Sequence, residues 1–559
     1  MTTRHLFVGL DGADPDLVRA LGPRRLPILH GLMDAGVWAR LRSVRPPATL
    51  PNWATLLTGV DPGVHGVFDF TTRTGSRVRF TAGTVRAAPT VCARLDRLGL
   101  SCACVGFPGT WPPERLDHGV FISGWDAPVA FEADRSYVWP PALHSEMTRL
   151  FGPTRFDDVD EFRADDFDWH RRLPAALCRR VERGADLGEW LLRTRTWNLF
   201  AIYFGESDTA AHHLWGLHDA DSPRHPGAVD RAVADGLGRV YESIDHALAR
   251  LIRASGGDEV EITISSDHGS GGSSDKILYL NRVLAEAGLL TFRRDRGVAR
   301  AMQVAKELAL TRLPPAPRER LFRAAGAMLP GWVESQTRFG AIDMTRTRAF
   351  SEELNYFPSV WINLRDREPH GTVEASDVQA LTREVESTLL ALRDPWTGQP
   401  IVESVLPRAD VYAGPLTDRA PDLIVTLHLD RGYSYGLLPS GTAPRGTGPF
   451  RRLHPEEYLG RKGRSLPGSH RDRGLFVAAG PLVAQAGEID AAVADVPATL
   501  LARMGVAIPP ELAGRVLWEA LRKVVGDPRP LPEAQVRPAD RAAEEGLVEA
   551  RLRALGYVD

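Results

Sequence analysis

Short apolar runs that recur between helical patterns constrain the fold of this chain more than any other feature. The runs His5–Leu10, Ser101–Phe107 and Trp197–Phe204 each have the length of a buried strand. Two more follow at Glu259–Ser265 and Leu475–Ala479. Strands that alternate with helices predict an α/β fold, with a mainly parallel central sheet and helices on both of its faces.

The length of 559 residues allows two to four domains, or one large α/β domain with insertions. We expect residues 1–291 to form the first part of the core, interrupted at about 111–168 by an irregular excursion that covers the site. An Arg-rich helical insertion is expected at 292–345. The second part of the core would occupy 346–525, and a peripheral tail 526–559.

The charge balance and the cysteine spacings limit the kinds of partner and motif that this chain can have. Acidic residues outnumber basic ones by only three, 71 against 68, which argues against a general binder of nucleic acids. The four cysteines have neither a C-x-x-C pair nor a zinc-finger spacing. The N-terminus has no signal-like region, and no apolar run reaches the roughly 18 residues of a membrane span. We therefore expect a cytoplasmic protein without a membrane span.

Acidic residues and histidines stand where several of these strands end. Open α/β sheets place their functional sites at the carboxyl ends of the strands. Each residue alone has an ordinary alternative, such as a turn aspartate, a helix cap or a loop histidine. Together they supply three carboxylates and three imidazoles, a ligand set that suits two divalent ions such as zinc or manganese. The six residues are Asp11, Asp208, His212, Asp267, His268 and His470.

The segment from Arg45 to Gly59 has the signals of a helix. Pro51 suits the first helical position, Leu50 the cap and Gly59 the end. Thr49 would then lie just ahead of the helix, beside unpaired N–H groups and the positive end of the dipole, which favour a phosphate or a developing alkoxide. Thr49 is therefore a candidate nucleophile. The alternative is an ordinary capping residue.

These motifs, taken in chain order, resemble the alkaline phosphatase superfamily. Within it they are most similar to the type I phosphodiesterase/nucleotide pyrophosphatase branch and its bacterial relatives. The resemblance covers about residues 9 to 480. The matching stretches are Gly9-Leu-Asp-Gly-Ala13, Ala48-Thr-Leu-Pro-Asn52, Thr58-Gly59, His65-Gly66, Asp208-x-x-x-His212, Ser266-Asp-His-Gly269 and Gly468-Ser-His470.

The resemblance implies an alkaline phosphatase-like fold and a phosphoric ester hydrolase that forms a phospho-threonine intermediate on Thr49. The expected activity is that of a phosphodiesterase, nucleotide pyrophosphatase or phosphatase on a small phosphorylated substrate. Two metal ions are implied, Zn2+ first and Mn2+ second. One would be held by Asp208, His212 and His470, and the other by Asp11, Thr49, Asp267 and His268.

The sequence departs from the family pattern at Phe70, which stands where characterised nucleotide pyrophosphatases have an asparagine that donates to the phosphoryl oxygen. A phenyl ring cannot donate, so backbone N–H groups, Asn52 or Lys276 are expected to bind the substrate instead. A phosphomutase with the same two metals is the main alternative, and a non-catalytic scaffold a weaker one. A sulfatase is disfavoured because the C/S-x-P-x-R context is absent.

Overall fold

The computed structural model describes residues 4–124, 137–152, 159, 167–293, 335–444, 446–460, 465–522 and 529–530. Most of the expected helical insertion at 292–345, part of the excursion at 111–168 and nearly all of the tail at 526–559 lie outside these residues. Among the described helices, none has the length and apolar character that a membrane crossing requires.

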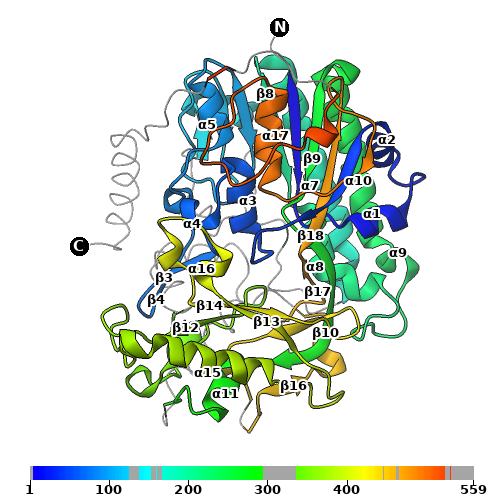
Figure 1. The fold of residues 1–559 in the computed structure, drawn as a ribbon. Coiled ribbons are helices and arrows are strands. Elements are labelled where there is room, and N and C mark those ends of the chain that lie inside the picture. Colours follow the sequence, from blue (N-terminus) through cyan, green and yellow to red (C-terminus); the bar gives the residue numbers. More distant parts are fainter. Residues whose placement is uncertain are drawn as a thin grey trace.

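A nine-stranded sheet forms the upper lobe in the order β19-β2-β18-β9-β1-β8-β5-β6-β7 (Figure 1). In its centre, β1 pairs in parallel with β8 and β9, and β5 with β8 and β6. β18 runs antiparallel between β9 and β2. This confirms the mainly parallel sheet. The strands are β1 (His5–Leu10), β2 (Val37–Arg42), β5 (Cys102–Val105), β6 (Val120–Ile122), β7 (Val138–Trp139), β8 (Leu199–Phe204), β9 (Glu261–Ser265), β18 (Arg473–Ala479) and β19 (Gly487–Glu488).

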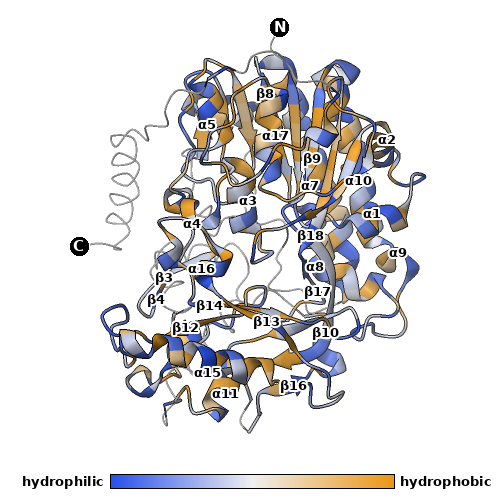
Figure 2. Cartoon of the chain, viewed as in Figure 1, coloured by the Kyte–Doolittle hydropathy of each residue, from blue (hydrophilic) through white to orange (hydrophobic). Residues whose placement is uncertain are grey.

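Helices cover both faces of this sheet because successive side chains of a strand point to opposite sides. Leu6 and Val8 pack into one hydrophobic core, whereas Phe7 packs into the other. Hydrophobic residues are concentrated in the central strands (Figure 2). The first face carries α1 (Pro15–Leu21), α2 (Pro27–Ala35), α6 (Pro141–Phe151), α7 (Phe167–Thr194), α8 (Glu206–His218), α9 (Arg231–Ala234) and α10 (Gly236–Ser255); the second carries α3 (Thr49–Thr58), α5 (Val91–Asp96) and α17 (Asp495–Arg503).

A long strand, β10 (Gly269–Leu278), leads from the upper lobe into a lower one (Figure 1). Its first half pairs with β17 (Gly468–Arg471), and its second half pairs with β15 (Ser434–Leu437) and β16 (Phe450–Arg452). A second sheet has the order β11-β12-β14-β13. The other strands and α-helices of the described residues are β3 (Thr71–Thr74), β4 (Arg77–Phe80), β11 (Ala349–Phe350), β12 (Ser359–Ile362), β13 (Val402–Pro407), β14 (Leu423–Leu427), α4 (Pro62–His65), α11 (Leu280–Glu286), α15 (Val378–Leu390) and α16 (Arg408–Val411).

The expected second part of the core, residues 346–525, is therefore divided between the lower lobe and the central sheet. Strands β11 to β16 build the separate sheets of the lower lobe, and among the described residues the chain returns to the central sheet at β18. The strand pattern of the sequence does not reveal this division, because an apolar strand can pair with any neighbour that its connections allow.

Candidate metal and catalytic site

Three adjacent strands of the central sheet deliver most of the candidate residues to one edge. Asp11 follows β1, Asp208 lies in the first turn of α8 after β8, and Asp267 and His268 follow β9. β17 pairs with the beginning of β10 and brings His470 to the same place. Residues that are far apart in sequence thus meet where the carboxyl ends of parallel strands come together.

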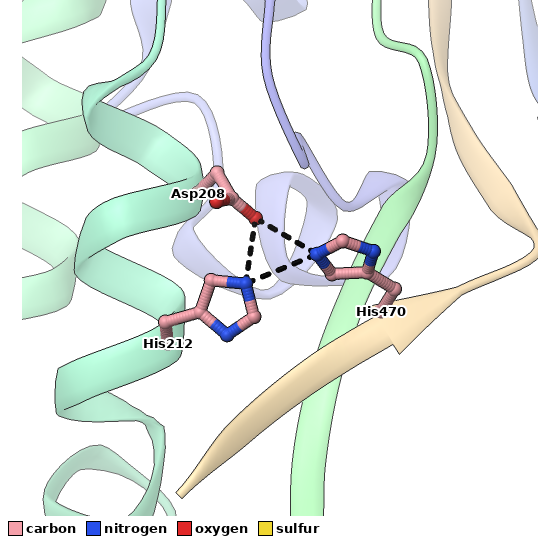
Figure 3. Close-up of side chains that lie close together, drawn as sticks. All are labelled: Asp208, His212 and His470. Atoms are coloured by element: carbon pink, nitrogen blue, oxygen red, sulfur yellow. Dashed lines mark hydrogen bonds and ion pairs between the residues drawn. The ribbon is translucent and has the colours of Figure 1, made fainter. Parts of the chain in front are cut away.

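One group consists of Asp208, His212 and His470 (Figure 3). Asp208 and His212 lie one turn apart on α8, with 3.3 Å between Oδ1 and Nε2. His470 Nε2 lies 3.0 Å from His212 Nε2 and 3.6 Å from Asp208 Oδ1. Three potential ligand atoms therefore face a common point.

A second group surrounds His268. Its Nε2 lies 3.2 Å from Asp267 Oδ2, 3.4 Å from Asp11 Oδ1 and 3.4 Å from Thr49 Oγ1. Asp208 belongs to this group as well, since its ligand atom lies within 4.8 Å of those of Asp11 and His268. The two groups are therefore neighbours, with Asp208 between them.

The histidine tautomers are fixed by backbone carbonyls. The Nδ1 of His268 faces Gly269 O at 3.0 Å, that of His470 faces Pro47 O at 2.7 Å, and that of His212 faces Gly468 O at 3.1 Å. A ring nitrogen opposite a carbonyl carries the hydrogen, so each Nε2 is left with a lone pair directed into the site.

Burial keeps two of these rings neutral. It lowers the pKa of His268 to about 3, and it lowers the pKa of His470 well below its usual range, with the neighbouring histidines adding to the effect. Neutral imidazole is the form that binds metal ions.

The residues fit a metal site on their own chemistry. Asp267 is fully buried, and its Oδ2 accepts no hydrogen bond from any described residue. Burial, together with the charge of Asp11, raises the pKa of Asp267 well above its ordinary value. A cluster of buried carboxylates that faces imidazole lone pairs is costly without a cation. Divalent ions would remove this cost, so the ligand set suits them.

Thr49 is the first residue of α3, and Ala48 is its cap. The predicted cap at Leu50 and start at Pro51 are therefore wrong by two residues. The N–H groups of the first helical turn have no acceptor within the helix. Proline, which lacks an N–H group, is therefore accommodated at the third helical position as well as at the first. Thr49 is nevertheless at the positive end of the helix, as expected.

Asn52 is fully buried and binds backbone groups. Its Oδ1 accepts from Val44 N at 2.8 Å, and its Nδ2 donates to Pro46 O and Ala48 O at 2.9 and 2.8 Å. These bonds close the loop that leads into Thr49. Asn52 therefore holds the backbone of the candidate nucleophile, and its amide is already engaged in the loop.

Lys276 lies away from this cluster. It is the eighth residue after His268 along the extended strand β10, a path of roughly 25 Å. Its buried Nζ lies 2.6 Å from Asp394 Oδ2 and 3.0 Å from Asp430 Oδ2. Its charge is balanced by these two carboxylates, and the structure does not bring it to the metal ligands.

Tyr356 lies in an irregular segment between β11 and β12, and no motif in the sequence marks it as part of the site. Its ring stacks on His470 with 3.9 Å between centroids and an angle of 10°. His268 stacks on the other face of His470 at 3.7 Å, and the Tyr356 hydroxyl lies 3.3 Å from His212 Nδ1. The lower lobe thus fixes the orientation of His470.

Arg224 is a second residue without a sequence signal. It is fully buried, and burial lowers its pKa to about 9. The guanidinium donates to the carbonyls of Glu457, Tyr458, Ser465 and Leu466. These bonds hold the chain just ahead of Gly468, whose carbonyl accepts from His212.

The fold and the site define a class: an α/β protein that places a hydroxyl at a helix start beside a cluster of carboxylate and imidazole ligands. The sequence model of the type I phosphodiesterase / nucleotide pyrophosphatase family matches residues 5–442. The chain belongs to this metal-dependent family of the alkaline phosphatase superfamily, and is a hydrolase of phosphoric esters. His470 lies beyond the matched residues, so its position comes from the structure.

Among solved structures, the chain is similar to human ectonucleotide pyrophosphatase / phosphodiesterase 5, with 14% identity over 93% of this chain and 100% of that one and a TM-score of 0.49. The murine protein matches with 13% identity over 92% and 98% of the two chains and a TM-score of 0.47. An inactive variant of the murine protein in complex with AMP matches with 12% identity over 91% and 96% and a TM-score of 0.46. A search of curated proteins found no match.

Proposed function

We propose that this protein hydrolyses small phosphodiesters with the help of two divalent metal ions, through a phospho-threonine intermediate on Thr49. One observation carries the proposal: the Thr49 hydroxyl, at the start of α3, lies 3.4 Å from the Nε2 of His268, within the cluster of candidate ligands. A hydroxyl in that position can serve as both ligand and nucleophile.

Asp208, His212 and His470 would hold one ion. Asp11, Asp267, His268 and the Thr49 oxygen would hold the other. Zn2+ is our first choice and Mn2+ our second, because the ligands are carboxylates and imidazoles without a thiolate. When bound, such ions supply Lewis-acid stabilisation of the attacking and leaving oxygens of an in-line displacement.

In the first step, Thr49 Oγ1 attacks phosphorus, the bond from phosphorus to the leaving oxygen breaks, and the proton that Oγ1 gives up ends on the leaving alcohol. In the second step, water attacks the phospho-threonine, the bond from phosphorus to Oγ1 breaks, and the hydroxyl is restored. The helix start favours both steps, because its dipole stabilises negative charge near Thr49.

Phe70 cannot take part in this stabilisation. It packs against the apolar cluster of Leu50, Ala54 and Val67, next to the nucleophile. The first amides of α3 have no acceptor within the helix, so those of Thr49 and Leu50 are the donors that we assign to the phosphoryl oxygens. Asn52 acts through the loop that it closes.

Hydrolysis of bis-p-nitrophenyl phosphate and p-nitrophenyl phosphate, with and without chelator, tests the proposal. We expect metal-loaded protein to cleave the diester, and chelation to abolish the activity. Absence of turnover with either ester would overturn the proposed activity. In 18O-labelled water the released phosphate should carry solvent oxygen, whereas a phosphomutase would pass the phosphoryl group to a second hydroxyl of its substrate.

A further inference from the structure

The two oxygens of the Asp11 carboxylate have different surroundings. Trp53 Nε1 donates to Oδ2 at 3.1 Å, and the Tyr203 hydroxyl donates to the same oxygen at 2.5 Å. The other oxygen, Oδ1, lies 3.4 Å from His268 Nε2. One oxygen is therefore hydrogen-bonded to the protein interior, while the other faces the candidate metal site.

Packing holds both donors in place. The rings of Trp53 and Tyr203 meet edge to face, with 5.4 Å between centroids and an angle of 83°. Phe107 lies 5.3 Å from the ring of Trp53 and 5.7 Å from that of Tyr203. A Cβ atom at Gly9 would lie 2.6 Å from the ring of Trp53, so this close approach requires a glycine. Neither donor can turn away from Asp11 without disturbing the core.

The same two residues connect Asp11 with other parts of the site. Trp53 lies four residues after Thr49 on α3, so one helical turn separates the candidate nucleophile from a donor to Asp11. Tyr203 lies near the end of β8, five residues before Asp208. The hydroxyl of Thr49 and both groups of ligands are thus tied to the orientation of one carboxylate.

We propose that Trp53 and Tyr203 are positioning residues that make Asp11 bind its metal ion through Oδ1 alone. The proposal rests on the two-ion site described above. Two hydrogen bonds hold Oδ2 inside the protein, so it cannot swing round to take a second coordination position on the ion. Loss of such an outer hydrogen bond typically weakens metal affinity or activity by about 10- to 100-fold.

The test compares Tyr203→Phe and Trp53→Phe with a matched control, Tyr241→Phe. Tyr241 is also fully buried, but its hydroxyl accepts from Asp14 N at 3.3 Å. Metal-free protein is titrated with Zn2+ in competition with a chromophoric chelator, which resolves two affinities. We expect Tyr203→Phe and Trp53→Phe each to weaken one affinity by about 10- to 100-fold and to leave the other unchanged. The control should change neither.

A spectroscopic measurement distinguishes a change in metal coordination from a general loss of stability. The visible absorption of Co2+-loaded protein reports coordination, so it should change in Tyr203→Phe and not in Tyr241→Phe. The proposal would be overturned if Tyr203→Phe had the same Zn2+ affinities and the same Co2+ spectrum as the parent protein. An equal loss of both affinities together with a larger fall in melting temperature than the control shows would overturn it as well. These readouts need no turnover, so a parent that binds two Zn2+ ions but cleaves no ester would refute the proposed function alone.

Discussion

The Nε2 atoms of His212 and His470 lie 3.0 Å apart, although the other nitrogen of each ring already faces a backbone carbonyl. When both imidazoles are neutral, this arrangement directs their lone pairs at each other, which is unfavourable unless a cation lies between them. Asp208 completes this group of three, so the contact fits a candidate metal site.

Replacement of His470 by glutamine should therefore reduce bound zinc from two equivalents to one. The amide cannot replace the imidazole in a site whose geometry is set by the stack of Tyr356, His470 and His268. Metal content after dialysis, measured by atomic emission, checks this. His118→Gln, at an exposed histidine, serves as the control. Two equivalents retained in His470→Gln would contradict the assignment.

Replacement of Thr49 by alanine should lower kcat by at least about 1,000-fold and leave metal content near normal, because it removes the nucleophile and only one of several ligands. Thr58→Ala is the matched control: it removes a buried hydroxyl from the same helix, one that bonds to Ala54 O at 2.6 Å. Steady-state hydrolysis of bis-p-nitrophenyl phosphate gives the comparison. Turnover in Thr49→Ala equal to that of the control would exclude Thr49 as the nucleophile.

Replacement of Lys276 distinguishes a structural role of this side chain from a role in substrate binding. Lys276→Met leaves Asp394 and Asp430 buried without their partner, so we expect a loss of about 3–5 kcal/mol in unfolding free energy. The KM of the folded enzyme should not change. Arg452→Met is the control: this half-exposed residue lies 3.3 Å from Asp275, and its loss should cost about 1 kcal/mol or less. An increase in KM with unchanged melting temperature would restore Lys276 as a substrate ligand.

The sequence could predict the ligands that follow strands, and little of what surrounds them. Asp11, Asp208 and Asp267 follow apolar runs, and the geometry of parallel sheets places such residues at one edge. His470 arrives through the antiparallel pairing of β17 with β10, which no local pattern indicates. Its local sequence is equally typical of an ordinary loop histidine.

The expected role of Lys276 shows why substrate contacts were harder to predict. The sequence offers Lys276 as a replacement for the donor that is missing at Phe70, whereas its partners Asp394 and Asp430 lie more than a hundred residues away. Tyr356 was missed for the same reason, because its contact with His470 depends on how the lower lobe meets the sheet. Long-range partners decide the role of such residues.

Glu353 provides the last prediction, because it anchors the segment that carries Tyr356. Its buried carboxylate accepts from Asn281 N at 2.9 Å and from Ser440 Oγ at 2.6 Å, and also from Ser440 N. Burial nevertheless raises its pKa to about 7, from an ordinary value of 4.5. Between these values the folded protein binds more protons at this site than the unfolded chain does. The contribution of Glu353 to stability must therefore be greatest below pH 4.5 and must fall as the pH rises towards 7.

Glu353→Gln removes this titration. We expect the unfolding free energy of the parent, minus that of the variant, to fall by on the order of 3 kcal/mol between pH 4.5 and pH 7.5. The slope of this difference with pH is the informative quantity, because the amide also alters one hydrogen bond and thereby shifts the whole curve. Denaturant unfolding in the presence of chelator measures it, with Glu374→Gln, at an exposed ion pair with Arg365, as the surface control. Parallel curves for the parent and Glu353→Gln would mean that Glu353 keeps the same protonation state on folding, and that the segment bearing Tyr356 is held without a pH-dependent contact.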